Sequence, residues 1–132
     1  FDGESITIRR VGTGEYAAFL NEAREKKHDL LVLHYYDGET LCTRICADRT
    51  ARRLAIENKT ADVLSTAFGV DQNPNWEDLV AFLESRCIPR RRDGLQHYLT
   101  RLGLERYDPL EIIRKTEGRM AEDGCWIKIV EG

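Results

Sequence analysis

Arginine is the residue type in this sequence whose number and spacing most clearly suggest chemistry. Four arginines lie within the seven residues from 86 to 92, the densest run of one charge in the chain. The planar guanidinium group matches the oxygens of phosphates and carboxylates, so such a run is typical of anion binding. We therefore predict that nucleic acid or an acidic protein is bound by five arginines: Arg86, Arg90, Arg91, Arg92 and Arg119.

The position of Pro89 sharpens this prediction. A residue that precedes proline is pushed out of the helical region, so one helix must end before Pro89 and the next is expected over residues 90–102. Three arginines then fall in the first turn of a helix, where the dipole repels cations unless an anion is near. Two sources of that anion stay open: a carboxylate of the chain such as Glu84 or Glu122, or the phosphate of a partner.

A second basic segment lies upstream of the first. Residues 44–53 carry a net charge of +3 and residues 86–106 a net charge of +4, whereas the whole chain carries −3. The rest of the chain is acidic, so the two segments would polarise the surface if they meet in space. We predict a secondary basic patch formed by Arg49, Arg52 and Arg53.

The cysteines do not define a metal centre. Cys42 and Cys46 are expected on one face of a strand but about 13 Å apart, which is too far for one zinc ion. All four cysteines are expected to be reduced thiols in a cytoplasmic protein. The sequence predicts no catalytic residue, no metal ligand and no cofactor. Trp76 and Trp126, at the ends of expected elements, are predicted to seal the core, with stacking against a partner as the alternative.

The elements that must position these residues predict an α+β fold in a single domain over residues 1–132. Alternating or continuous apolar runs predict an antiparallel sheet of about four to five strands. The expected strands are residues 5–10, 29–36, 39–46, about 53–58 and 125–130. The second half is expected to be mostly helical and to close on the C-terminal strand. No apolar run approaches the roughly 20 residues that cross a membrane.

Local turn and capping signals give the boundaries of several elements. Asp37-Gly38 predicts a hairpin with a two-residue type I′ turn. In that register Leu33 faces Cys42, Val32 faces Thr43 and Leu30 faces Ile45. Asn75 and Asp108 are expected to cap two helices, the second through a capping box with Glu111. A short helix is expected over residues 61–68.

Residues 56–130 carry a series of motifs that resembles a group of small uncharacterised proteins from Firmicutes genomes, often found on mobile elements. The motifs are Glu57-Asn58-x-Thr60, Ala67-Phe68-Gly69, Asn73-Pro74-x-Trp76, Ser85-Arg86-Cys87-x-Pro89-Arg90-x-Arg92, Leu102-Gly103-Leu104, Tyr107-Asp108-Pro109-Leu110, Lys115-Thr116-x-Gly118-Arg119-Met120-Ala121-Glu122-Asp123 and Trp126-Ile127. The resemblance implies a regulatory, toxin-related or anti-defence role and extends to no part of residues 1–50.

These observations predict a non-enzymatic binding or regulatory module of a bacterial or mobile-element system. The alternative is a protein–protein inhibitor or anti-defence factor that binds no nucleic acid. A small hydrolase or nuclease is less favoured, because it would need a pocket that joins Glu122 or Asp123 to His34 or His97.

Overall fold

The computed structural model describes residues 13–71 and 73–132 and contains one four-stranded antiparallel sheet. Its strands lie in the order β3-β2-β1-β4, with β4 beside β1. The bounds are β1 Leu30–Asp37, β2 Thr40–Asp48, β3 Arg53–Asn58 and β4 Cys125–Glu131. The α+β prediction, including the closing C-terminal strand, is confirmed. The expected strand over residues 5–10 lies outside the described residues.

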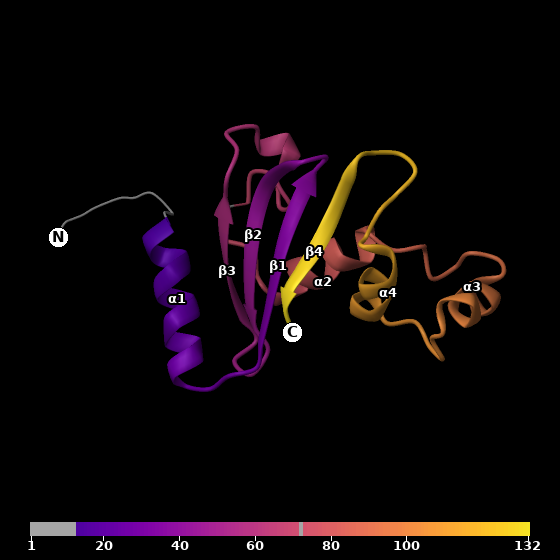
Figure 1. Ribbon diagram of the computed structural model, residues 1–132, viewed down its shortest axis with the longest axis horizontal. Helices are drawn as coiled ribbons and strands as arrows, with labels where there is room; N and C mark the ends of the chain where they lie inside the picture. The colour runs from indigo at the N-terminus through magenta and orange to yellow at the C-terminus, as the bar shows by residue number, and fades with distance from the viewer. Residues whose placement is uncertain (1–12, 72) are drawn as a thin grey trace.

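Helices lie on both sides of the sheet (Figure 1). Helix α1 (Thr13–Glu25) packs against β2 and β3. On the other side lie α2 (Trp76–Ser85), α3 (Leu95–Leu102) and α4 (Pro109–Thr116). The segment expected as a short helix over residues 61–68 forms only one 3-10 turn, η1 (Val63–Ser65), which Asp62 caps by accepting the N–H of Leu64.

The main core lies between the sheet and α2, α3 and α4. Its fully buried side chains include Leu33, Ile45, Leu79, Leu99, Ile112, Ile113 and Ile127. Each buried side chain of this size contributes about 1.5–3 kcal/mol to stability. A smaller cluster on the α1 side contains Tyr16, Ala23, Leu30, Val32 and Cys46. Two apolar clusters therefore hold the sheet from opposite faces.

The predicted N-caps of α2 and α4 are present, but the capping box predicted between Asp108 and Glu111 is not formed, because the Glu111 carboxylate accepts from Arg114 instead. Asn75 accepts the N–H of Asp78, and the Asp78 carboxylate accepts the N–H of Asn75, which completes a capping box. Asp108 accepts the N–H groups of Leu110 and Glu111, with Pro109 as the first helical residue. Such caps stabilise a helix by about 1 kcal/mol each.

The predicted register of the β1–β2 hairpin is wrong. Leu33 lies opposite Ile45, Val32 opposite Cys46 and Leu30 opposite Asp48. The loop is Gly38-Glu39 instead of Asp37-Gly38, and of these two loop residues only Gly38 has a positive φ, at 61°, so the turn is not type I′. The pairing also contains an irregularity: Tyr36 lies opposite Leu41 but Tyr35 lies opposite Thr43, so β2 has one additional residue, Cys42, at this point.

The same irregularity changes the direction of the cysteines. Cys42 lies in the main core and Cys46 in the cluster on the α1 side, so the expectation that they share a face is wrong. All four cysteines are free thiols, and Cys42, Cys46 and Cys87 are buried. Burial raises the pKa of Cys46 to about 11 and that of Cys87 to about 12.

Candidate functional site

Arg86 is a buried structural residue. It follows the last turn of α2, where a cation is favoured by the helix dipole, and only 7% of the residue is exposed. Nη1 and Nη2 each donate to one carboxylate oxygen of Asp123 at 3.0 Å. Nε donates to the carbonyl of Gly118 and Nη2 also to that of Cys125, both at 2.9 Å.

This network joins the end of α2 to the segment that precedes β4. The Arg86 guanidinium holds the pKa of Asp123 below its usual range, and Asp123 raises the pKa of Arg86 against the effect of burial. With four hydrogen bonds inside the protein, Arg86 does not have its charge available for a partner. We therefore correct the prediction that Arg86 belongs to the anion-binding set.

The three arginines after Pro89 lie in a loop and not in a helix. Helix α3 begins at Leu95, because Gly94 before it takes the left-handed conformation with φ 76°. The predicted repulsion between a helix dipole and these arginines is therefore absent. The loop leaves Arg90, Arg91 and Arg92 exposed.

Two of the three loop arginines lie over tyrosine rings. The guanidinium carbon of Arg90 is 4.2 Å from the ring centre of Tyr107, and that of Arg92 is 5.9 Å from the ring centre of Tyr98. Tyr107 is itself anchored, since its hydroxyl donates to the carbonyl of Ile88 at 2.6 Å. A guanidinium that stacks on a ring keeps its N–H edge open to solvent, where it can bind oxygen acceptors.

Arginine–carboxylate pairing neutralises only part of this charge. Arg90 lies 3.4 Å from Glu84, which was one of the two predicted internal partners. Arg119 lies 2.8 Å from Glu117. No carboxylate among the described residues forms an ion pair with Arg91 or Arg92. The internal source of the expected anion therefore applies to Arg90, which pairs with Glu84. For Arg91 and Arg92, the anion of a partner stays open.

A cleft of about 260 Å³ brings the predicted residues together. Arg86 forms part of its wall, and Arg92 and Arg119 line it from two different segments. The other lining residues are Ile88, Pro89, Tyr98, Thr116, Met120, Ala121 and Glu122. Three of the five predicted arginines, Arg86, Arg92 and Arg119, thus line this cleft, and Arg90 and Arg91 lie exposed in the loop beside it.

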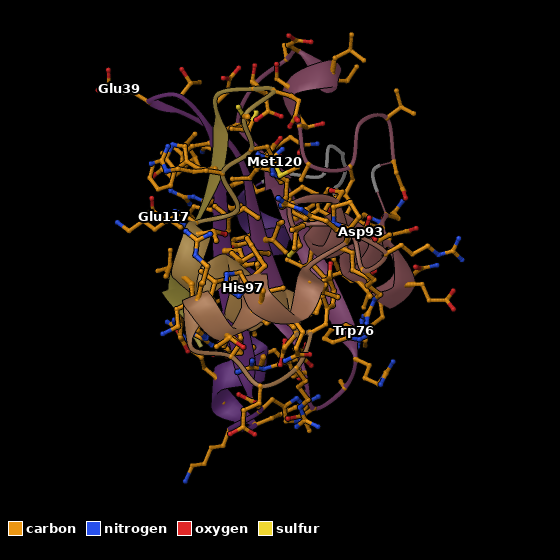
Figure 2. The ribbon with its side chains drawn as sticks, turned by 90° about the vertical axis from the view of Figure 1, so that its right-hand side faces the viewer. Glu39, Trp76, Asp93, His97, Glu117 and Met120 are labelled. Carbon is orange, nitrogen blue, oxygen red and sulfur yellow. The ribbon has the colours of Figure 1, made fainter. Side chains whose placement is uncertain are left out.

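The secondary basic patch is separate from this region. Arg52 lies over the ring of Trp76, 5.5 Å from its centre, at the start of α2, whereas Arg86 follows the end of the same helix. Ten helical residues correspond to about 15 Å. Figure 2 shows Trp76 below Asp93 and Met120 on the side that carries α3 and α4. Arg52 and Arg86 therefore lie at opposite ends of α2.

The secondary patch is also reduced to two residues. Arg49 donates to the Asp29 carboxylate at 2.8 Å and lies near the carbonyl of Leu30, so it stabilises the start of β1. Arg53 lies 5.9 Å from the ring centre of Phe19, and Arg52 and Arg53 line a cleft of about 230 Å³ with Trp76.

The acidic and histidine side chains do not converge on a hydrolytic site. Asp123 is bound to Arg86, and Glu122 lines the arginine cleft. His34 lies in β1 between Arg44 and Lys128 of the neighbouring strands, and His97 is exposed on α3. Within residues 13–71 and 73–132, no cluster of three histidines, cysteines or carboxylates could hold a metal ion.

Sequence reasoning did not find the tyrosines that support the arginines. The two pairs join residues that are distant along the chain, since 17 positions separate Arg90 from Tyr107 and 6 separate Arg92 from Tyr98. Only the clustering of arginine and tyrosine in one segment could have indicated these pairs, and it does not specify which residues meet.

Comparisons with protein-family models, with curated proteins and with solved structures found no match. In the described part of the chain, no helix combines the length and apolarity needed to cross a membrane. The fold and the cleft therefore define an α+β protein with an arginine-rich, aromatic-supported surface.

Proposed function

We propose that this protein is a non-enzymatic binding module that contacts the phosphates of nucleic acid through Arg90, Arg91, Arg92 and Arg119. The observation that carries the proposal is that the exposed Arg90, Arg92 and Arg119 lie over aromatic rings, while Arg92 and Arg119 line one cleft. Phosphate contacts of arginine supply most of the affinity of such modules and make it depend on salt.

Nucleic acid is favoured over an acidic protein because aromatic rings accompany the arginines. Rings beside guanidinium groups are typical of surfaces that bind nucleic acid, since they add stacking to phosphate contacts. The resemblance to mobile-element proteins supports a regulatory role in such a system. The free thiols support a reducing, cytoplasmic setting.

The experiment is fluorescence anisotropy of a labelled oligo(dT) of about 12 nucleotides and of a duplex of similar length, measured between about 50 and 200 mM salt. Four phosphate contacts predict a slope of log affinity against log salt of about −3 on a single strand. The double variant Arg91→Glu, Arg92→Glu should weaken binding to both probes and reduce the magnitude of the slope by about 1.4.

The matched control is the double variant Arg52→Glu, Arg53→Glu, which makes the same charge change at the other end of α2. It should change affinity much less than the loop variant. Equal losses in the two variants would show that net charge alone drives binding and would overturn the proposed site. Absence of binding to every nucleic acid, with salt-sensitive binding to poly-glutamate, would replace nucleic acid by an acidic protein.

A further inference from the structure

An aromatic pair lies on the sheet face opposite the main core. Tyr36 of β1 and Trp126 of β4 are direct cross-strand partners, and their rings stack with centres 4.6 Å apart and an interplanar angle of 11°. The indole N–H of Trp126 donates to the carbonyl of Gly38 at 2.8 Å, which fixes the ring. Both residues are only partly buried, and because Tyr36 and Arg119 both pack on the Trp126 ring, the outer face of Tyr36 is the face of the pair that a ligand can reach.

Basic side chains surround this pair. The guanidinium carbon of Arg119 is 4.9 Å from the ring centre of Trp126. On the same sheet face, a row across the strands places His34 between Arg44 and Lys128. Burial lowers the pKa of His34, and the positive charges of Arg44 and Lys128 lower it further, so His34 is expected to be neutral near pH 7.

The one carboxylate in that row has its own partners. Glu57 lies opposite Arg44 and is bound by it at 3.2 Å and by Lys59 at 3.6 Å. Lys128 is exposed and lies on the strand that also carries Trp126. Lys128 therefore adds positive charge to this face beside the rings, whereas Arg44 and Arg119 share theirs with Glu57 and Glu117, and this charge complements a polyanion that offers aromatic groups.

Arg119 connects this surface to the cleft. Its side chain lines the cleft with Arg92 and also lies over Trp126. Half of the Arg119 side chain is exposed, although it is also bound to Glu117. A flexible ligand can thus follow one continuous path from the loop arginines, over Arg119, to the Tyr36–Trp126 pair.

We propose that the ligand is single-stranded nucleic acid and that one of its bases stacks on the Tyr36–Trp126 pair while its backbone follows Arg119 and the loop arginines. This inference rests on the proposed function and deepens it. A base can reach an aromatic platform only when it is unpaired, because a duplex buries the faces of its bases in its own stack. The pair therefore selects single strands over duplexes.

Tryptophan fluorescence tests the stacking directly, because the chain contains only two tryptophans. The variant Trp76→Phe leaves Trp126 as the sole tryptophan, and the variant Trp126→Phe leaves Trp76 as its matched control. Oligo(dT) and oligo(rU) of about 12 nucleotides should quench the emission of Trp126 and leave that of Trp76 nearly unchanged, and a duplex should quench neither.

A substitution at Tyr36 gives a second readout. Tyr36→Thr should weaken single-strand binding about tenfold, whereas Tyr36→Phe should retain it, and duplex binding should change in neither variant. Thermal melts of both variants check that the sheet is intact. The conservative variant separates loss of the ring from loss of the hydroxyl group.

The outcomes distinguish this inference from the function on which it rests. Salt-sensitive binding that leaves Trp126 unquenched would overturn the stacking inference and leave the arginine site standing. Equal affinity for single strands and duplexes would likewise overturn the stacking inference and leave the arginine site standing. Failure of every nucleic acid to bind would overturn both proposals together.

Discussion

The Arg86–Asp123 pair allows the sharpest test of how this fold is held together. The variant Asp123→Asn keeps the size of the side chain and removes its charge. In the wild type the Asp123 carboxylate accepts two N–H groups of Arg86 and the backbone N–H of Cys125. The variant retains one oxygen acceptor and leaves the Arg86 guanidinium, with 8% of its side chain exposed, without a counter-charge.

The size of the effect follows from the burial of the two partners. Removal of one partner from a fully buried pair costs about 3–5 kcal/mol. Because 41% of the Asp123 side chain is exposed, water replaces part of the lost interaction, and we expect a loss of about 2 kcal/mol. For a chain of this length that corresponds to a fall in melting temperature of roughly 5–10 °C.

The loss should depend on pH with a defined sign. The pKa of Asp123 is lowered in the folded protein, so its contribution to stability is complete above the ordinary aspartate pKa of about 3.9. It is lost as the pH falls through the lower pKa of the folded state. The difference in free energy of unfolding between wild type and Asp123→Asn should therefore be constant near neutral pH and shrink below about pH 4.

Urea denaturation at a series of pH values measures this difference. The matched control is Glu122→Gln, an exposed neighbour whose variant should change the free energy of unfolding by less than about 0.5 kcal/mol. Arg86→Met should cost more than Asp123→Asn, because it also leaves the carbonyls of Gly118 and Cys125 unpaired. A loss at Asp123 no larger than that at Glu122, or one that grows as the pH falls below 4, would refute the structural role of the pair.

Two further predictions concern the helix cap and the thiols. Asp108→Ala should reduce the free energy of unfolding by about 1 kcal/mol, because it removes the acceptor for the N–H groups of Leu110 and Glu111, and a urea titration beside the exposed control Asp93→Ala checks this. Ellman's reagent at about pH 8 should react with the partly exposed Cys125 well before Cys46 and Cys87, whose pKa values are raised to about 11 and 12; single Cys→Ser variants identify the reactive thiol, and rapid reaction of Cys87 in folded protein would contradict the assignment.

The parts of the fold that were predictable from sequence depend on neighbouring residues. The Asn75 cap requires only Asp78, and the Asp108 cap requires only the next three residues, so both follow from local patterns. The alternation in Cys125–Glu131 likewise predicts a strand from its own residues.

The features that were missed depend on geometry that a local pattern does not contain. The hairpin register differs from the prediction because the loop lies one residue later in the chain and the strands contain an irregularity between Tyr35 and Tyr36. Because Gly94 takes the left-handed conformation, α3 begins at Leu95 and not at residue 90 as predicted, so three arginines lie in a loop. Arg86 was assigned to the wrong role because its partner, Asp123, lies 37 positions away in the sequence.

The arginines fall into two groups that differ in burial and in partners, and the two groups have different roles. Arg86 is buried, is paired with Asp123 and fixes the segment that leads into β4, so it places Arg119 and Trp126 where they are. The exposed Arg90, Arg92 and Arg119 lie over rings instead, which orients their guanidinium groups, and carboxylates pair with two of the three, Arg90 and Arg119. A run of arginines that only solvated the surface would need neither arrangement. The buried arginine therefore supports the segment that carries part of the exposed charge, which is the arrangement that the proposed anion-binding site would use.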